Sequence, residues 1–318
     1  MMNQNTTENF CTIFDSNFLP IGLTLARTLR QHCGQSLLWV ICLDQKVYEQ
    51  LVKLNLPQIR PVSLAKVETE ALLAVKSKRT RAEYAWTLTP FACDVVFKLA
   101  PDVKRATYVD ADLGFFDSPM YLIDEMVQAN KDVLITEHAF APEYSQGIKH
   151  GRFCVQFMTF NNTPLARSVM QRWQQQVLEW CYARLEKGRF GDQMYLDTWP
   201  KEHAQVVHIL KHSQRTLAPW NVSYIAQTQG KLDPVFYHFH GLRFITPDKI
   251  RLFTGYRINS QARERYDQYL VQLRQSVDLL KASNISTASI PLQKGLKASL
   301  ERLLQKCRGL DAFVMLND

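Results

Sequence analysis

Short apolar runs alternate with helical segments in the first part of the chain, and this alternation restricts the fold more than any other feature. Phe10–Phe14 and Leu37–Leu43 are apolar runs of strand length. Each precedes a segment with apolar residues at helical spacing, one opened by Pro20 and one by Asp44, which can cap a helix. The order strand, helix, strand, helix is typical of parallel strands joined by crossover helices. The sequence therefore predicts an α/β fold with a mostly parallel central sheet and flanking helices.

The alternation continues into the middle of the chain. Thr89-Pro90 is a cap and first-turn pair for a helix that runs through Lys98. Ala106–Val109 is a strand that leads directly into Asp110, and Val133–Thr136 is another. Two carboxylates are therefore expected where a central strand ends.

Further strands are expected before and after one long helix. Phe153–Phe160 alternates as a half-buried strand does, and short strands are expected near Val206–Leu210 and Val235–Phe239. Thr163-Pro164 caps the helix and Gly188 ends it. Its expected apolar stripe is Leu165, Val169, Trp173, Val177, Trp180 and Leu185.

The composition divides the chain into a main domain, residues 9–280, and a tail, residues 281–318. The tail starts as a Ser/Thr/Asn-rich linker, and Pro291 then introduces a basic amphipathic helix. Its leucines and basic residues are Leu292, Leu296, Leu300, Leu303, Leu304, Lys294, Lys297, Arg302, Lys306 and Arg308. Such a helix lies on an anionic membrane or packs against the main domain, and the sequence leaves both open.

The charge balance favours an anionic partner. The 318 residues include 38 Lys and Arg against 30 Asp and Glu, a formal net charge of +8. Phosphorylated substrates, a membrane surface and nucleic acid all match this charge. No basic stretch with interleaved aromatic residues and no RNA-binding signature occurs, so we expect no nucleic-acid partner.

The cellular compartment is inferred from the first residues and the cysteines. Met1–Asn9 is polar and lacks the features of a secretory signal, and no long uncharged apolar stretch follows. The 7 cysteines include no CxxC pair, which favours reduced and mostly buried thiols. We expect a cytoplasmic protein, with peripheral contact at the inner membrane as an option.

The strongest local motif is the pair Asp110 and Asp112. Side chains at positions i and i+2 share one face of extended chain, so both carboxylates can reach one cation. Hard carboxylate oxygens suit Mg²⁺ or Mn²⁺, and a diphosphate would supply further oxygens. A solvated turn is the alternative, because this motif also occurs by chance.

Several blocks in the chain resemble one enzyme family. Phe14–Phe18, Tyr84–Pro90 and Thr107–Pro119 are followed by the blocks Gly191–Pro200, Leu217–Asn221 and Tyr237–Gly241. In this order they resemble bacterial glycosyltransferases of the glycosyltransferase A fold, related to the retaining family eight, over roughly residues 10–270. The resemblance implies that residues 9–280 form a glycosyltransferase A catalytic domain, with the C-terminal helical tail appended.

The resemblance assigns the metal ligands. In such enzymes a histidine three residues before a glycine near the end of the domain is the third ligand, which places His238 with Asp110 and Asp112. His240 is the competitor for this position, and either histidine can instead be structural. Ala111, between the two carboxylates, would lie against the donor.

The resemblance also implies a UDP-sugar donor. Asp15 at the end of the first strand would accept a hydrogen bond from the base, with Phe18 packing nearby, although Asp15 can instead cap the turn. Asp192 would orient sugar hydroxyls, and Gln193 would stabilise positive charge at the reacting carbon. A helix-capping Asp192 beside a surface Gln193 is the alternative.

One block departs from the family pattern. Relatives tend to have Tyr-Asn-Val-Gly where this chain has Phe153, Cys154, Val155 and Gln156. Cys154 and Gln156 thus occupy positions expected to contact the donor, with a thiol and a longer side chain in place of an amide and a glycine. Because of this departure, donor specificity and activity can differ from those of the family.

The sequence therefore predicts a metal-dependent, retaining glycosyltransferase that uses a nucleotide-sugar donor and a glycan or lipid-linked acceptor. A sugar nucleotidyltransferase is an alternative, but it needs a Gly-rich loop after the first strand, where this chain has Asp15–Pro20. A glycoside hydrolase needs two carboxylates across a cleft and no metal motif. A non-catalytic membrane or nucleic-acid binder is supported by charge alone.

Overall fold

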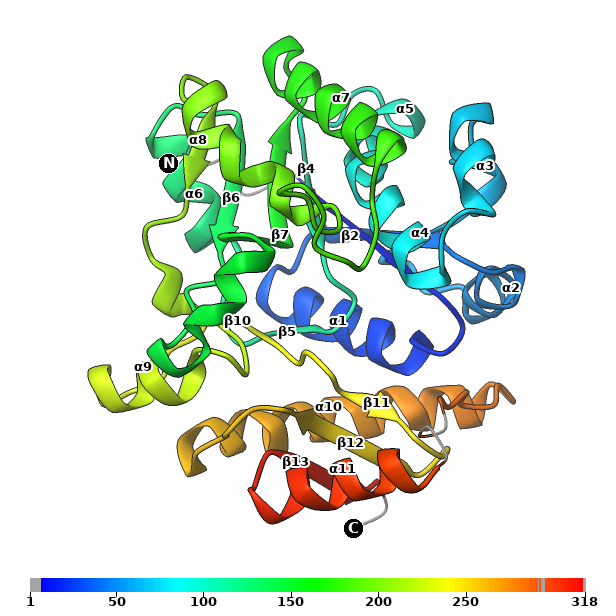
Figure 1. Ribbon diagram of the computed structural model, residues 1–318. Helices are drawn as coiled ribbons and strands as arrows, with labels where there is room; N and C mark the ends of the chain where they lie inside the picture. Colours follow the sequence, from blue (N-terminus) through cyan, green and yellow to red (C-terminus); the bar gives the residue numbers. More distant parts are fainter. Residues whose placement is uncertain (1–6, 291, 293–294, 317–318) are drawn as a thin grey trace.

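A computed structural model describes residues 7–290, 292 and 295–316 of the chain. Figure 1 shows its elements, coloured along the sequence. In chain order they are β1 (Glu8–Phe14), α1 (Leu19–His32), β2 (Ser36–Cys42), α2 (Gln45–Leu54), β3 (Ile59–Ser63), η1 (Leu64–Lys66), α3 (Glu70–Lys76), α4 (Arg81–Leu88), η2 (Thr89–Phe91), α5 (Ala92–Leu99), β4 (Arg105–Val109), β5 (Leu113–Phe115), α6 (Met120–Gln128), β6 (Val133–Glu137), η3 (Pro142–His150), β7 (Phe153–Asn161), α7 (Pro164–Glu179), η4 (Gln193–Thr198), α8 (Trp199–Glu202), β8 (Val207–Ile209), η5 (Ser213–Arg215), β9 (Thr216–Leu217), α9 (Val222–Gln229), β10 (Phe236–His238), β11 (Arg243–Phe244), β12 (Lys249–Thr254), α10 (Ser260–Ala282), α11 (Leu296–Cys307) and β13 (Asp311–Met315).

The centre of the protein is a seven-stranded sheet in the order β3-β2-β1-β4-β7-β6-β8. Strand β7 runs antiparallel to both its neighbours, and the other pairs are parallel. The predicted α/β class with a mostly parallel sheet is confirmed. Since parallel strands end at the same edge of a sheet, the residues after β1, β2, β4 and β6 lie along one edge.

Helices cover both faces of this sheet, with α5 and α7 on one side and α1 on the other (Figure 1). Trp173 of α7 belongs to one core, and Leu25 of α1 belongs to the other. Strand β7 contributes to both, so Phe153–Phe160 is buried throughout. The expectation of a half-buried strand is therefore wrong, because a central strand covered on both faces has no solvent side.

The helix expected to begin at Thr89-Pro90 begins elsewhere. Thr80 caps α4 through a capping box with Glu83, so the helical segment begins before Thr89. Pro90 lies in the short 3-10 turn η2 between α4 and α5, where its missing N–H interrupts the helix. Asp44 caps α2 as predicted, and its side chain accepts the N–H of Val47.

Helix α7 is shorter than predicted. Thr163 caps it as expected, but it ends at Glu179, and Gly188 lies in the loop beyond. The loop closes on itself, since the Gly191 N–H donates to the Tyr182 carbonyl at 3.0 Å. Leu165 and Leu185 are exposed, so they are not part of the apolar stripe, whose buried members are Val169, Trp173, Val177 and Trp180.

A small sheet in the order β5-β10-β9 lies beside the main sheet. Strand β5 follows the Asp110–Asp112 segment directly, and β10 pairs with it antiparallel. The register sets His238 opposite Leu113, next to Asp112. This pairing brings the end of the domain to the DxD motif.

The C-terminal part forms a layer below α1 in Figure 1. Helix α10 packs along α1, where the hydroxyl groups of Thr24 and Ser276 lie 2.9 Å apart. The predicted tail forms α11, and β13 then pairs with β12 in the sheet β11-β12-β13. This last strand was not predicted. The division of the chain at residue 280 stays a prediction.

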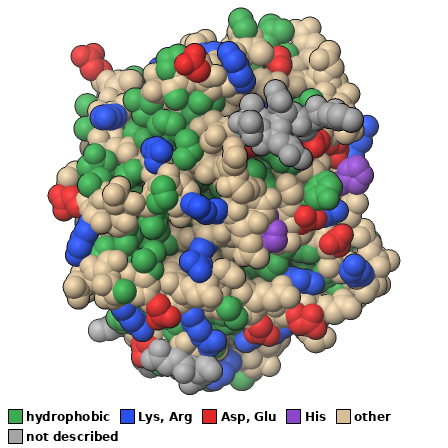
Figure 2. All heavy atoms as spheres, turned by 180° about the vertical axis from the view of Figure 1, so that it is seen from behind, with side chains coloured by type: hydrophobic (Ala, Val, Ile, Leu, Met, Phe, Trp, Pro, Cys, Tyr) green, Lys and Arg blue, Asp and Glu red, His purple; other side chains and the backbone are tan. Residues whose placement is uncertain are grey.

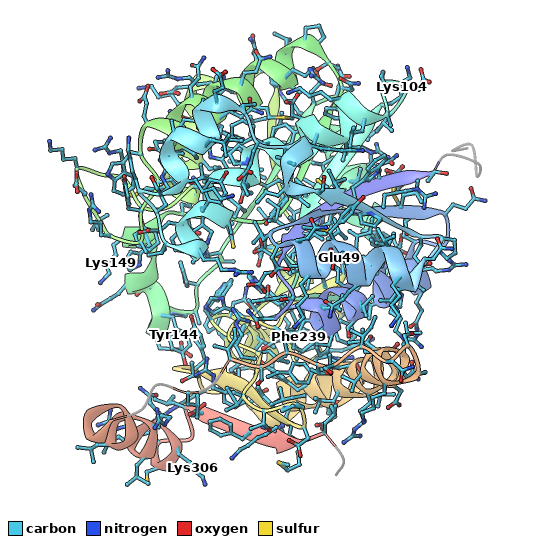
Figure 3. All side chains as sticks on the ribbon, turned by 90° about the vertical axis from the view of Figure 1, so that its right-hand side faces the viewer. Glu49, Lys104, Tyr144, Lys149, Phe239 and Lys306 are labelled. Atoms are coloured by element: carbon cyan, nitrogen blue, oxygen red, sulfur yellow. The ribbon has the colours of Figure 1, made fainter. Side chains whose placement is uncertain are left out.

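Helix α11 lies at the edge of the protein, with Lys306 on its outer side (Figure 3). Leu300, Leu303 and Leu304 are between 47% and 59% exposed. Pro291 and Lys294 lie outside the described residues, and the side chains of Leu296 and Lys297 are not described.

The distribution of surface charge and the length of the helices are relevant to the expected anionic and membrane partners. On the face shown in Figure 2, acidic and basic side chains are interspersed, so the positive net charge forms no continuous basic patch there. Among the described residues, no helix has the length and apolar character needed to span a bilayer.

Candidate active site

A cavity of about 790 Å³ opens at the edge of the sheet where the parallel strands end. The strand order arranges the residues along its floor: Asp15 follows β1, Asp110 follows β4, Cys154 lies in β7 and His138 follows β6. Neighbouring strands are about 4.8 Å apart, so these residues extend over roughly 14 Å. A long ligand can contact all of them at once.

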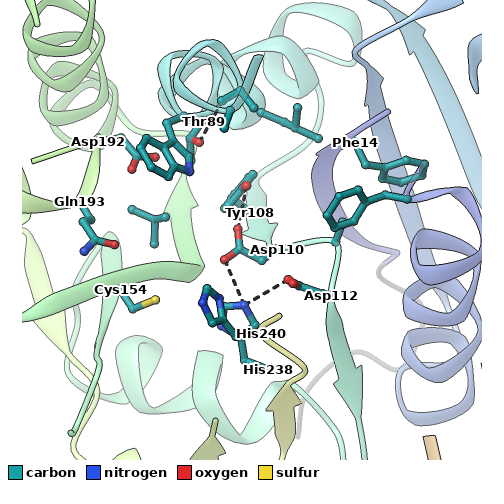
Figure 4. Close-up of a pocket in the computed structure, with 18 of the residues that line it drawn as sticks. Phe14, Thr89, Tyr108, Asp110, Asp112, Cys154, Asp192, Gln193, His238 and His240 are labelled. Atoms are coloured by element: carbon teal, nitrogen blue, oxygen red, sulfur yellow. Dashed lines mark hydrogen bonds and ion pairs between the residues drawn. The ribbon is translucent and has the colours of Figure 1, made fainter. Parts of the chain in front are cut away.

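Asp110, Asp112 and His238 form a compact triad in this cavity (Figure 4). His238 Nε2 lies 3.1 Å from Asp112 Oδ1 and 3.9 Å from Asp110 Oδ2. His240 is not part of the triad, and its ring lies against Trp220 with centroids 5.6 Å apart. The geometry thus places His238 with the two carboxylates.

The three side chains perturb one another's protonation. Burial raises the pKa of Asp110, against the attraction of His238. Burial acts in the same direction on Asp112, but His238 and Arg243 hold its pKa well below the usual value. The pKa of His238 is raised, because the two carboxylates outweigh the opposing effect of its burial. The carboxylate of Asp112 and the imidazole of His238 thus stabilise each other's charged forms.

These residues fit a divalent cation. One ligand atom from each side chain lies within 4.8 Å of the other two, and within the described ranges no further Asp, Glu, His or Cys group meets this condition. Two carboxylates suit Mg²⁺ and Mn²⁺, and the imidazole is better suited to Mn²⁺.

Two buried side chains hold the triad from outside. The Tyr108 hydroxyl donates to Asp110 Oδ1 at 2.9 Å. The Gln156 side chain lies with Oε1 2.8 Å from Nδ1 of His238. Gln156 is 1% exposed and is not among the residues that line the cavity. This placement gives no support to the expected contact between Gln156 and the donor.

Asp192 faces the cavity across from the triad (Figure 4). The side chain is 3% exposed, and its Oδ2 has no hydrogen-bond partner. Burial raises its pKa to about 7, opposed by a hydrogen bond from Thr89 and supported by the charge of Asp110. An unpaired buried carboxyl is costly to keep, so a ligand hydroxyl is its natural partner.

Gln193 lines the cavity next to Asp192. Its Nε2 donates to the His150 carbonyl at 2.8 Å, which fixes the amide against η3. The amide oxygen of Gln193 points toward the cavity (Figure 4). This oxygen is the group that positive charge on a ligand would attract.

The β1 end of the cavity is polar and charged. Asp15 accepts the Asn17 N–H at 2.9 Å, so it does cap its turn. Arg81 bridges Asp15 and Asp44, with Nε 2.7 Å from Asp15 Oδ2 and Nη2 2.6 Å from Asp44 Oδ2. Asp15 thus lines the cavity and closes a turn at the same time.

Arg243 lies between this end and the triad. Its guanidinium is 4.4 Å from the centre of the Phe18 ring, and its Nη1 is 3.4 Å from Asp112 Oδ2. Ala111 and Phe18 also line the cavity. A guanidinium beside the triad adds a second binding group for an anion.

An aromatic wall closes the β6 end. The rings of His138 and Phe140 stack with centroids 4.6 Å apart, and Trp220 Nε1 donates to the His138 carbonyl at 2.7 Å. Cys154 is 4% exposed and packs against Trp220. Burial lowers the pKa of His138 to about 4, so this end of the cavity is neutral at physiological pH.

The chain is 30% identical over 290 residues to YfnD of Bacillus subtilis (strain 168), an uncharacterized protein, and the alignment covers 87% of this chain and 92% of YfnD. It belongs to the YfnD family. YfnF, an uncharacterized protein of the same organism, is 27% identical over 261 residues, which cover 77% of this chain and 85% of YfnF. No protein-family profile matches the sequence.

Solved structures show the fold of this YfnD-family protein. The galactosyltransferase LgtC, in complex with donor and acceptor sugar analogues, aligns with a TM-score of 0.54 at 14% identity, over 84% of this chain and 95% of LgtC. The glycosyltransferase GlyE of Streptococcus pneumoniae TIGR4 aligns with a TM-score of 0.52 at 12% identity, over 90% of this chain and 66% of GlyE. The predicted glycosyltransferase A fold is confirmed.

Sequence reasoning missed several residues of this site in the YfnD-family chain. Arg81 lies in a charged stretch and Arg243 lies between Leu242 and Phe244, so no motif marks either one, and Tyr108 and Trp220 resemble ordinary core aromatics. The sequence did hold one signal for Tyr108, because it lies two residues before Asp110 and residues at this spacing in extended chain share one face.

Proposed function

We propose that this protein transfers a sugar from a nucleoside diphosphate donor, a UDP-sugar, to a glycan or lipid-linked acceptor, with retention of configuration and a divalent cation, Mn²⁺ or Mg²⁺. The observation that carries the proposal is the triad of half-buried Asp110 with buried Asp112 and His238, inside the large cavity of a glycosyltransferase A fold.

The order of groups along the cavity matches the order of groups in such a donor. The base lies at the β1 end beside Asp15 and Phe18, and the diphosphate lies at the triad with Arg243. The sugar then reaches Asp192 and Gln193 near β7. When bound, the cation neutralises the negative charge that grows on the leaving diphosphate.

Three side chains of the protein supply the chemistry that the cation does not. Arg243 binds a phosphate oxygen, which replaces its long contact to Asp112. Asp192 accepts a sugar hydroxyl through its unpaired oxygen and so orients the ring. Gln193 offers its amide oxygen to the positive charge that develops at the reacting carbon, while its anchored Nε2 holds it in place.

The acceptor enters at the β6 end, against the aromatic wall of His138, Phe140 and Trp220. Neutral rings bind the apolar faces of a sugar without requiring charge on it. We also propose that α11 contacts an anionic membrane, because three exposed leucines lie beside the basic Lys306 and Arg308. This contact would bring lipid-linked acceptors to a cytoplasmic enzyme.

A panel of nucleotide sugars tests the proposal, with released nucleoside diphosphate as the readout and Mn²⁺ present. Release from one donor or a few, lost in EDTA, is expected. The anomeric proton coupling of the product, read by NMR, then reports retention. Formation of nucleoside triphosphate and sugar 1-phosphate when pyrophosphate is added to the nucleotide sugar would instead identify a nucleotidyltransferase, and no turnover of any donor would remove the proposal.

A further inference from the structure

Gln156 contacts two of the three triad residues at once. Its Oε1 lies 2.8 Å from His238 Nδ1, and its backbone carbonyl accepts the Asp110 N–H at 3.0 Å. The second contact extends the pairing of β7 with β4 and fixes the Gln156 backbone beside the DxD motif. The side chain is buried and, within the described ranges, is not among the cavity-lining residues. The Gln156 side chain therefore contacts the triad from the protein interior and not from the cavity.

The contact to His238 selects one form of the imidazole. A neutral imidazole carries one proton, so one nitrogen donates a hydrogen bond and the other accepts. An amide oxygen only accepts, so the nitrogen that faces Gln156 must carry the proton. With Nδ1 donating to Gln156, Nε2 is the nitrogen that can exchange its proton for a cation, and it faces Asp112 and Asp110 at 3.1 and 3.9 Å.

We propose that Gln156 is a positioning residue that holds the His238 imidazole in the form with the proton on Nδ1, so that Nε2 is ready to bind a divalent cation. The proposal rests on the proposed function, because that function assigns the triad to a cation. Gln156 itself touches neither the cation nor the donor. Its role replaces the donor contact expected from its sequence position.

The opposite tautomer would disable the triad. With the proton on Nε2, an N–H would point at the two carboxylates, where the cation must bind. Burial keeps water from replacing Gln156 as the acceptor for Nδ1, so loss of the amide would leave a buried N–H without a partner. Partners of metal-bound histidines generally affect metal affinity through this outer hydrogen bond.

Mn²⁺ binding measured by electron paramagnetic resonance, without nucleotide and without turnover, tests the proposal. Gln156→Met has a similar size and no oxygen, and its Mn²⁺ affinity is expected to fall by about ten- to a hundredfold. Gln156→Glu keeps an oxygen acceptor and is expected to retain most of the affinity. Thr159→Val is the matched control on β7, since it removes a buried hydroxyl paired with Thr107 away from the triad.

The outcomes separate this proposal from the proposed function. If the wild-type protein binds no Mn²⁺, the metal-dependent function fails. If the wild-type protein binds Mn²⁺ and Gln156→Met binds it equally well, the positioning role alone is overturned. Equal losses in Gln156→Met, Gln156→Glu and Thr159→Val would also overturn it, because they would indicate a general effect on the fold.

A second measurement tests the proposal without the Gln156→Met variant, in case that variant does not fold. Wild-type protein with ¹⁵N-labelled histidine is titrated with Cd²⁺, a diamagnetic ion, and the His238 signals are assigned by their loss in His238→Ala. The expected spectrum shows the proton on Nδ1 before and after Cd²⁺ addition. A proton on Nε2 with none on Nδ1 in the metal-free or Cd²⁺-treated protein would contradict the proposal.

Discussion

The imidazole of His238 lies 3.1 Å from the carboxylate of Asp112, because β10 pairs with β5 in a register that sets His238 opposite Leu113. The pairing is antiparallel and lies outside the main sheet. The cluster of Asp110, Asp112 and His238 is thus completed by two segments that the sequence separates widely.

Asp112→Asn is expected to reduce turnover by roughly a hundredfold or more, because the cation loses a charged ligand and the leaving diphosphate loses stabilisation. Steady-state rates at saturating Mn²⁺ measure the effect, and circular dichroism checks the fold. His238→Ala is expected to raise the Mn²⁺ concentration needed for half-maximal rate, whereas His240→Ala should change it little. A larger shift in His240→Ala would reassign the third ligand.

Asp192→Asn is expected to lower turnover strongly while leaving UDP affinity close to that of the wild type, since the assigned contact of Asp192 is to the sugar. Kinetics give the first quantity and UDP titration gives the second. A parallel loss of both would mean that Asp192 maintains the cavity instead of contacting the donor sugar.

The same substitution is expected to stabilise the metal-free fold at neutral and higher pH. The folded carboxyl keeps its proton up to a pKa of about 7, whereas the unfolded carboxyl loses it near 3.8. The folded state therefore binds more protons in this window, and its stability falls as pH rises through it. The melting temperature of Asp192→Asn should exceed that of the wild type at pH 8, and the difference should shrink toward pH 4. A constant difference across this range would refute the assignment.

The sequence predicted the main sheet and the carboxylates at the centre of the site. The alternation of strands and helices predicted the sheet, and the position of Asp110 at a strand end predicted a carboxylate pair at its edge. The position of Gln156 behind His238 could not be predicted, because it depends on the register between β4 and β7. The strand β13 was missed because tertiary packing, not local pattern, decides it. The break at Pro90 and the capping box of Thr80 with Glu83 are local signals that the prediction did not use.

Arg243→Ala is expected to weaken UDP binding in Mn²⁺ by about tenfold, because one charge-assisted hydrogen bond to phosphate is lost. Uridine, which carries no phosphate, should bind both proteins equally, and calorimetry with the two ligands gives the comparison. If uridine binding falls as much as UDP binding, Arg243 acts through Phe18 at the base end.

The triple substitution of Leu300, Leu303 and Leu304 by Glu is expected to abolish co-sedimentation with vesicles that contain phosphatidylglycerol. Wild-type binding should weaken at high salt, since part of it is electrostatic. Leu165→Glu on α7 is the control, because Leu165 is a leucine of similar exposure, 52%, far from α11 in sequence. Equal sedimentation of all variants would remove the membrane contact.

Calorimetric titration of UDP into the wild-type protein, with Mn²⁺ and then with EDTA, tests the central claim most directly. The triad should bind the diphosphate through the cation, so we expect affinity to fall by at least about tenfold in EDTA and to be low in Asp112→Asn under both conditions. UDP that binds equally well with and without Mn²⁺, or not at all in either condition, would contradict the account.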